Sequence, residues 1–289
     1  MRGKITIYNR SKVQIDYNYQ YGIASMLYLK LAESDVKLAN EMHSHQGFKF
    51  YTFSNLTLED KKQCRTGLDF DRAHFFLSSP DERFIRSFAE GLLMNPGFYL
   101  EGVQGRVNFT IERIEILPAP EFGEECTFKT ISPIYVKTQR NVEGKLKEFD
   151  LYPSEPKFYE NLHKNLIERY SEFYGSPPEK EHFEVVEVSH VKPRRIRIAQ
   201  DYRRCSLMHL RIQANPELLK FAYDAGLGEK NAMGFGYVDL MNSSQQLKNL
   251  TADSESRLGR AQAYVDSRSR RVIGTPMNAD LMHQFHAPC

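Results

Sequence analysis

The sequence has few cysteines and no long apolar segment. Its 289 residues include four cysteines, Cys64, Cys126, Cys205 and Cys289, and no two of them form a CxxC pair. This scatter argues against a zinc site and indicates reduced, structural thiols. No apolar run approaches the roughly 18 residues of a membrane-spanning helix, and the N-terminus lacks the apolar region of a signal peptide. We therefore expect a cytoplasmic protein with no membrane partner.

Two further absences limit the function. The formal net charge is only +2, so any sign of a nucleic-acid partner must come from how the basic residues are distributed. In the glycine-rich stretch 226–236, neither G-x-G-x-x-G nor G-x-x-x-x-G-K-[ST] can be completed, which argues against a nucleotide cofactor. We expect no cofactor. Asp69 and Asp71 form a D-x-D pair, but no third ligand accompanies them, and we expect no metal site.

The glycine-rich stretch itself, GLGEKNAMGFG, is the most distinctive segment of the chain. It follows a helix expected to begin at Asn215-Pro216 and leads into an expected strand at 237–240. Glycines leave the backbone bare, so such a loop can approach a ligand closely and adopt φ > 0. Alternatively, Gly226 ends the helix and the other glycines form a turn. The pattern leaves both interpretations open.

Hydrophobic periodicity predicts an α+β protein with two similar halves. In the first half it indicates a helix over 20–32, a second helix capped by Ser34, and a strand over 48–53. Ser79-Pro80-Asp81-Glu82 matches a capping box with proline at the first helical position. Inward-facing residues of the strand 106–117 change parity between Ile111 and Ile114, which predicts a β-bulge.

The second half repeats this order. Segments 127–130 and 134–136 are expected to be extended, followed by a long helix bearing Phe158, Leu162 and Leu166. Strands are then expected at 183–188 and 194–210, the second turning near Asp201. Each half thus has the order βαββαβ, which is that of the ferredoxin-like motif.

We therefore expect two tandem ferredoxin-like (RRM-like) domains. The first covers 1–118, and the second covers 119–242 and contains the glycine-rich loop. Residues 243–289 lose aromatic and branched residues and gain Ser, Asn and Gln, so a mostly disordered tail is expected there.

Basic residues cluster in the strand pair that precedes the glycine-rich loop. The cluster comprises Lys192, Arg194, Arg195, Arg197, Arg203, Arg204 and Arg211, with Asp201 as the only acidic residue among them. This excess of positive charge favours phosphate contact over an ordinary solvated ribbon. Lys192 and Arg194 share one face of the strand, and Arg195 and Arg197 share the other. Only one set can face a nucleic acid, and the pattern does not decide which.

Several motifs together resemble a known family. Pro216-Glu217-Leu218-Leu219 and the glycine-rich loop are similar to the C-terminal glycine-rich motif of the CRISPR-associated endoribonucleases of the Cas-six family, which process repeat RNA. The similarity continues in the segments Ile15-Asp16-Tyr17-Asn18, Gly47 to Leu56 (GFKFYTFSNL), Phe75 to Pro80 (FFLSSP) and Ile131 to Val136 (ISPIYV). It covers residues 1 to about 241 and agrees with the fold expected above.

The resemblance implies a catalytic set of Tyr28, His43 and Lys49, because the similar archaeal enzymes carry tyrosine, histidine and lysine at this spacing. Histidine can act as acid or base near neutral pH, while lysine stays cationic and can stabilise a phosphorane. Packing on the apolar side of its helix is the alternative role for Tyr28. His45 is the alternative catalytic histidine, and the family spacing favours His43.

The resemblance also implies an RNA-binding set, in which basic strands and the glycine loop hold the repeat. The residues expected to bind RNA are Lys192, Arg194, Arg195, Arg197, Arg203, Arg204, Gly226, Gly228, Lys230, Gly234 and Gly236.

The expected function is metal-independent cleavage of CRISPR precursor RNA within its repeats by 2′-hydroxyl attack. The products are a 2′,3′-cyclic phosphate or 3′-phosphate and a 5′-hydroxyl. The alternative is a non-catalytic RNA-binding protein of the same fold in an effector complex. Expected partners are precursor and mature guide RNA; other CRISPR effector proteins and a second copy of the chain are further candidates.

Overall fold

The structure, a computed structural model, describes residues 1–60, 64–198 and 200–241 of the chain. Residues 1–240 form one compact unit of helices and antiparallel sheets. The α+β class expected from the sequence is therefore confirmed. The expected tail, 243–289, lies outside the described residues.

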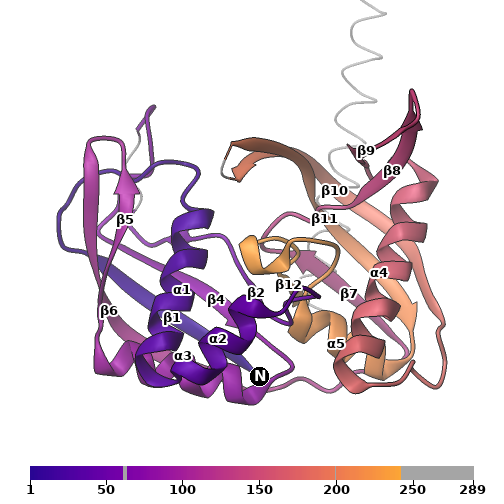
Figure 1. Cartoon of the computed structure of the whole chain (residues 1–289), viewed down its shortest axis with the longest axis horizontal. Helices are drawn as coiled ribbons and strands as arrows, with labels where there is room; N and C mark the ends of the chain where they lie inside the picture. The colour runs from indigo at the N-terminus through magenta and orange to yellow at the C-terminus, as the bar shows by residue number, and fades with distance from the viewer. Residues whose placement is uncertain (61–63, 199, 242–289) are drawn as a thin grey trace, which may run out of the picture. The chain divides into compact units, whose positions relative to one another are not determined.

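The first half forms a sheet with helices packed against it (Figure 1). Its strands are β1 (Arg2–Asn9), β2 (Thr52–Phe53), β3 (Thr57–Leu58), β4 (Arg72–Ser78), β5 (Gly97–Gly102) and β6 (Gly105–Leu117). Its helices are α1 (Gln20–Ser34), α2 (Val36–Ser44) and α3 (Glu82–Met94). The strand order is β2-β4-β1-β6-β5, and β3 also pairs with β4. Alternate strand residues such as Ile5, Ile7 and Phe75 are buried in the core with apolar residues of α1 and α3.

The predicted bulge is confirmed. The register between β1 and β6 shifts where Thr6 pairs with Arg113 and Ile7 with Ile111, which leaves Glu112 as the extra residue. The extra residue explains why Ile111 and Ile114 both pack on the core although their spacing is odd.

Three predicted boundaries in this half are wrong. The helix α2 is capped by the side chain of Asp35, and Ser34 is the last residue of α1. The helix α3 is capped by Asp81, not by Ser79, so the proline precedes the cap. In both cases a carboxylate accepts a backbone N–H of the first helical turn. The strand expected over 48–53 is reduced to β2, which pairs only with the end of β4.

The second half forms its own sheet. Its strands are β7 (Glu125–Thr130), β8 (Lys137–Val142), β9 (Lys145–Asp150), β10 (Phe183–Ile198), β11 (Asp201–Ala214) and β12 (Val238–Leu240). Its helices are α4 (Pro156–Tyr174), α5 (Pro216–Ala225) and the 3₁₀ helix η1 (Asn231–Met233). The strand order is β10-β11-β7-β12, while β8 and β9 pair only with each other. The sequence did not predict the β8–β9 hairpin.

The strands β10 and β11 form a long ribbon. The predicted turn near Asp201 is confirmed, but the first strand continues without the expected break between 188 and 194. It can do so because His190 adopts a φ of +54° and the register shifts between Ser189 and Lys192. This local irregularity absorbs the extra residues without ending the strand.

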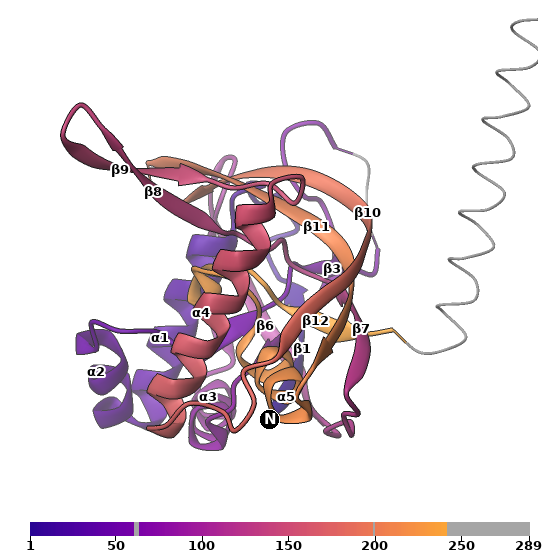
Figure 2. The same cartoon turned by 90° about the vertical axis from the view of Figure 1, so that its right-hand side faces the viewer.

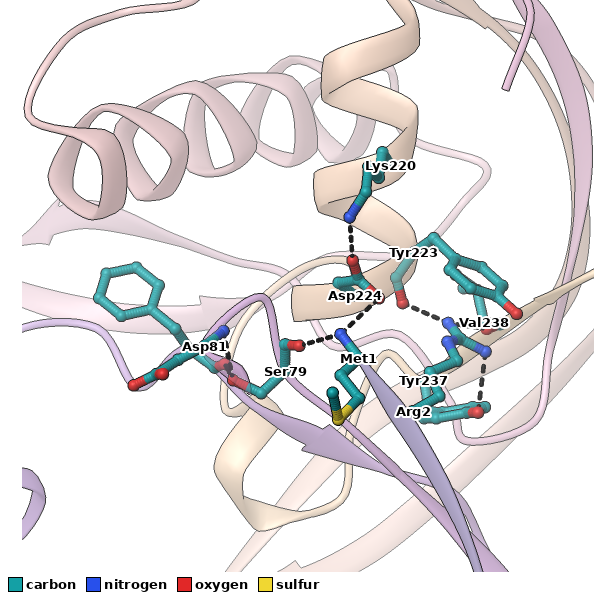
Figure 3. A network of polar contacts seen from close by, with 10 residues as sticks. Met1, Arg2, Ser79, Asp81, Lys220, Tyr223, Asp224, Tyr237 and Val238 are labelled. Atoms are coloured by element: carbon teal, nitrogen blue, oxygen red, sulfur yellow. Dashed lines mark hydrogen bonds and ion pairs between the residues drawn. The ribbon is translucent and has the colours of Figure 1, made fainter. Parts of the chain in front are cut away.

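The two halves are joined by a buried arginine (Figure 3). The Arg2 guanidinium donates to the Tyr237 hydroxyl at 2.8 Å, to the Val238 carbonyl at 2.7 Å and to the Tyr223 carbonyl. It also lies over the rings of Tyr223 and Tyr237, at 3.1 and 4.4 Å from their centroids. Beside it, Asp224 accepts a hydrogen bond from Lys220. A residue of β1 thus fixes α5 and β12 against the first sheet.

Candidate active site

Tyr28 and His43 lie together on adjacent helices. Tyr28 comes from α1 and is half-buried, while His43 comes from the last turn of α2 and is exposed. Their rings meet edge to face, with centroids 6.2 Å apart and an interplanar angle of 89°. Tyr28 also contacts the ring of buried Tyr51 at 6.4 Å. Burial raises the pKa of Tyr51 well above its ordinary value. Tyr28 is therefore packed on one side and faces the histidine on the other.

The helix that carries His43 is fixed at its N-terminal end by Asp35. One carboxylate oxygen of Asp35 accepts from the Leu38 amide at 2.9 Å, and the other accepts from Arg83 at 2.8 Å. The hydrogen bond from the Leu38 amide, followed by that from Arg83, holds the pKa of Asp35 below its ordinary value.

Lys49 closes the opposite end of the same helix. Its ammonium donates to the carbonyl of Met42 and, at 2.6 Å, to that of His45. These are carbonyls that a helix leaves without partners at its C-terminus. Burial lowers the pKa of Lys49. Because an ammonium has three N–H donors, one remains for a ligand after these two bonds. The ammonium of Lys49 thus binds the backbone on either side of His43 in the sequence.

His45 is tied to the second half of the chain. Its Nε2 atom lies 3.0 Å from Oε1 of Glu172, which also accepts from the Phe48 amide at 3.1 Å. Glu172 is on α4, far away in the sequence. The sequence analysis missed Glu172, because a glutamate on the polar face of a helix gives no sign of such a contact.

The four glycines of the loop are buried and have positive φ angles of 84°, 75°, 82° and 72° at Gly226, Gly228, Gly234 and Gly236. A Cβ atom at Gly236 would collide with the Leu227 carbonyl. At the other three positions it would meet neighbouring protein atoms in the same way. The glycines are therefore required for a tight turn packed on the protein itself. Of the two interpretations that the sequence left open, this packing favours the turn.

The buried side chain of Arg169 donates hydrogen bonds to the backbone where the glycine loop begins. It is 1% exposed and donates to the carbonyls of Ala225 at 2.6 Å and Gly226 at 2.9 Å. These carbonyls belong to the C-terminal end of α5, where a cation is favourable. Burial lowers the pKa of Arg169 to about 10.

A cavity of about 190 Å³ connects the two parts of the candidate site. Lys49 and Gly47 line it from the first half, and Arg169, Gly228 and Lys230 line it from the second. Lys230 is the exposed residue of the loop. The glycine loop and the loop after α2 are thus neighbours, although nearly 180 residues separate them in the sequence.

The pairing of β10 with β11 separates the basic cluster into two faces. Arg195 pairs directly with Arg204, and Arg197 pairs with Tyr202, so these four share one face. The guanidinium of Arg195 lies 4.1 Å from the centroid of the Tyr202 ring. Because all four side chains are exposed, this face is a positive surface.

The other face of the ribbon packs partly on the protein. It carries Arg194 and Arg203 together with buried Ile196 and Cys205. Arg203 pairs with Asp201 at 3.1 Å. Lys192 follows the register shift directly, lies on the same face as Arg194 and is exposed.

Two contacts at the ends of the ribbon modify the predicted cluster. Arg211 forms ion pairs with Glu187 and Glu125, so it does not contribute free charge. At the other end, the amide of Arg197 donates to Asn18 at 3.2 Å, which places the ribbon beside the start of α1.

Within 1–60, 64–198 and 200–241, no group of three or more His, Cys, Asp or Glu residues could hold a metal ion. None of the helices in the described part of the chain is long and apolar enough to cross a membrane.

Curated relatives match most of the chain. It is 38% identical over 254 residues to "CRISPR-associated endoribonuclease Cas6 1" of Methanocaldococcus jannaschii, covering 86% of this chain and 97% of the relative. It is 34% identical over 230 residues to "CRISPR-associated endoribonuclease Cas6" of Pyrococcus furiosus, covering 78% and 83%. It is also 34% identical to "Putative CRISPR-associated endoribonuclease-like protein Cas6nc" of Pyrococcus horikoshii, covering 78% and 93%.

Solved structures and family models agree with these relatives. A structure described as "CRISPR associated protein Cas6" is 37% identical, with a TM-score of 0.71, and covers 84% of this chain and 99% of its own. Another, "An RAMP protein binding different RNA substrates", is 32% identical, with a TM-score of 0.76 and coverage of 84% and 100%. Residues 14–115 match the model "CRISPR-associated protein Cas6, N-terminal", and residues 117–240 match "CRISPR associated protein Cas6, C-terminal". The chain belongs to the Cas6 family of CRISPR-associated endoribonucleases, which are RAMP proteins.

Proposed function

We propose that this protein is a metal-independent endoribonuclease that cuts CRISPR precursor RNA within its repeats. The RNA's own 2′-hydroxyl loses its proton and attacks the adjacent phosphorus, and the departing 5′-oxygen takes up a proton. The products are a 2′,3′-cyclic phosphate and a 5′-hydroxyl, and later hydrolysis of the cyclic phosphate by water gives a 3′-phosphate. The observation that carries the proposal is the edge-to-face pair of Tyr28 and His43, together with Lys49, whose ammonium binds the end of the helix that carries His43. Two relatives named as endoribonucleases support it.

The three side chains have distinct roles in this reaction. His43 is exposed on a helix end and transfers a proton at the 2′-hydroxyl or at the departing 5′-oxygen. Tyr28 orients the histidine and assists at the 2′-hydroxyl. Lys49 places positive charge near the phosphate, where negative charge accumulates in the transition state. Its two bonds to carbonyls also fix the helix end that presents His43.

RNA binding is assigned first to the exposed face of the ribbon, with Arg195, Arg197 and Arg204. Its support is the lack of a carboxylate on that face and the nearby Asn18 contact, which brings the ribbon toward α1. An Arg195→Ala variant that binds repeat RNA as tightly as the wild type would contradict this assignment. Lys192, Arg194 and Arg203 contribute weaker, long-range attraction.

In the glycine loop, Lys230 is the residue that reaches RNA. Gly226, Gly228, Gly234 and Gly236 shape the loop from within, because their backbone is buried. A Lys230→Ala variant with unchanged affinity for repeat RNA would contradict this assignment.

The two halves are proposed to be tandem ferredoxin-like domains, 1–118 and 119–242, followed by a tail. The strand orders β2-β4-β1-β6 and β10-β11-β7-β12 both have the arrangement expected for βαββαβ units. The two family models, which meet between residues 115 and 117, support the same boundary. Folding of an isolated 119–242 fragment, followed by its circular dichroism spectrum, tests this division; an unfolded fragment would contradict it.

A second candidate function is non-catalytic RNA binding within an effector complex. It is favoured by the contacts of Lys49, since two of its three donors are occupied by backbone carbonyls. One relative that is 34% identical to this chain is named "endoribonuclease-like", whereas another of the same identity is named an endoribonuclease. Other CRISPR effector proteins and a second copy of the chain are the partners that this function would require.

Substitution of the two histidines tests the proposed function. The wild-type protein is incubated with labelled repeat RNA from its own host, and cleavage and binding are measured separately. His43→Ala is expected to slow cleavage by about a hundred- to ten-thousand-fold and to leave binding intact. His45→Ala is expected to lose much less. A wild-type protein that does not cleave would favour the non-catalytic function. If His45→Ala abolishes cleavage and His43→Ala does not, His45 is the catalytic histidine.

A further inference from the structure

The β8–β9 hairpin has two chemically different faces. Directly opposite residues in an antiparallel pair share a face, and alternate residues of one strand do the same. Arg140 pairs with Lys147, Val142 with Lys145, and Thr138 with Phe149. One face, here called the basic hairpin face, is therefore Thr138, Arg140, Val142, Lys145, Lys147 and Phe149.

The basic hairpin face carries three cations and no carboxylate. The carboxylates of the two strands, Glu148 and Asp150, lie on the opposite face. There Glu148 pairs with Lys137, so its charge is neutralised locally. Arg140 lies 5.2 Å from the centroid of the Phe149 ring and 3.6 Å from Glu155, which is outside the hairpin. Arg140 is thus partly neutralised, and Lys145 and Lys147 carry most of the positive charge of this face.

The hairpin projects into solvent without a core of its own. Residues 139–141 and 145–149 are exposed, and Leu146 is 70% exposed. A two-stranded hairpin without a packed face is marginally stable in water. An exposed and charged hairpin of this kind adds little to the stability of the domain. It is better explained by contact with a ligand.

The base of the hairpin is attached to the basic ribbon. Asp150 accepts from the Arg204 amide at 2.9 Å and from the Tyr135 hydroxyl at 3.1 Å. The contact is made from the hairpin face opposite to the basic hairpin face and by the backbone of Arg204, so it fixes the base of the hairpin beside β11. Figure 2 shows the hairpin projecting from the second half, and its base contacts β11 through Asp150 and the Arg204 amide.

We propose that the basic hairpin face is a second RNA-binding surface, on which Arg140, Lys145 and Lys147 contact phosphates of the RNA held by the β10–β11 ribbon. The inference rests on the proposed function, since it takes repeat RNA as the ligand. The aromatic ring of Phe149 offers a surface for a base beside these phosphates.

The test is a triple variant, Arg140→Gln, Lys145→Gln and Lys147→Gln. The matched control, Arg86→Gln, Lys157→Gln and Lys164→Gln, removes the same charge from exposed helix positions. Affinity for labelled repeat RNA is measured for the full chain over a range of salt concentrations. Loss of three phosphate contacts is expected to make the slope of log K against log salt shallower by about 2 to 3 units. The control is expected to keep the wild-type slope.

Two results would overturn the inference. The first is a hairpin variant whose binding has the same salt dependence as that of the wild type. This result would mean that the basic hairpin face does not contact RNA. The second is an equal change in the hairpin variant and the control, which would mean that only the net charge matters. Cleavage by the wild type is measured in parallel. A wild-type protein that binds the RNA but does not cut it would contradict the proposed function as a nuclease. In that case the salt slopes would still show whether the hairpin binds RNA.

Discussion

The Nε2 atom of His45 lies 3.0 Å from Oε1 of Glu172, which joins the loop after α2 to the helix α4 of the second half. The same carboxylate oxygen accepts the amide of Phe48. The loop between His43 and Lys49 is thus held from the other half of the chain. Both side chains of the pair are partly exposed, so the pair adds at most about 1 kcal/mol to stability. Its effect is to position the loop.

Glu172→Ala is expected to impair cleavage more than folding. Without the carboxylate, the loop between His43 and Lys49 loses its contact with α4. A shift of about 1 Å in a catalytic group can cost up to about a hundredfold in rate, and we expect roughly tenfold here. Single-turnover cleavage and thermal melting measure the two effects. Glu168→Ala, one turn earlier on α4, is the control. Equal rates for Glu172→Ala and Glu168→Ala would contradict the positioning role.

The contribution of Asp35 to stability is expected to depend on pH. Its folded-state pKa is lowered, so this contribution is fully present above the ordinary value of 3.8 and is lost as the pH falls through the lower folded value. Asp35→Asn keeps a good helix cap but cannot ionise. The difference in unfolding free energy between wild type and variant should therefore be constant from about pH 7 to 5 and vanish near pH 2. A difference that persists undiminished near pH 2 would show that the charge is not involved.

Gly236→Ala is expected to destabilise the protein through both backbone and packing. A left-handed conformation costs a non-glycine residue about 1–2 kcal/mol, and the new Cβ would also collide with the Leu227 carbonyl. Gly175, at the C-terminal end of α4, has a similar φ of +76° but open space around it, so Gly175→Ala isolates the backbone cost. Urea denaturation of both variants measures the difference. If both lose the same stability, the close packing of the glycine loop is unimportant.

Periodicity and capping predicted much of the fold, because these patterns depend on neighbours in the sequence. The bulge at Glu112 and the helix bearing Phe158 were found in this way. The β8–β9 hairpin was missed because both its faces are exposed and its strands carry no apolar alternation. Burial of the glycine loop depends on contacts with distant residues such as Tyr135, which the sequence does not reveal.

The candidate site was predicted only in part for the same reason. Family spacing pointed to Tyr28, His43 and Lys49; the structure pairs the rings of Tyr28 and His43, and Lys49 binds the end of the helix that carries His43. The contact of Glu172 with His45 spans 127 residues, and that of Arg169 with Gly226 spans 57. No local pattern marks either partner.

The central claim is that the nucleophile is the 2′-hydroxyl of the RNA itself. The most direct measurement is single-turnover cleavage, in excess EDTA, of repeat RNA with and without one 2′-deoxy nucleotide just upstream of the cut. We predict that the unmodified RNA is cut in EDTA and that the 2′-deoxy RNA is bound but not cut at that position, because it has no oxygen to attack. Cleavage that stops in EDTA, or that persists at the same position in the 2′-deoxy RNA, would contradict the account and indicate a metal-dependent nuclease.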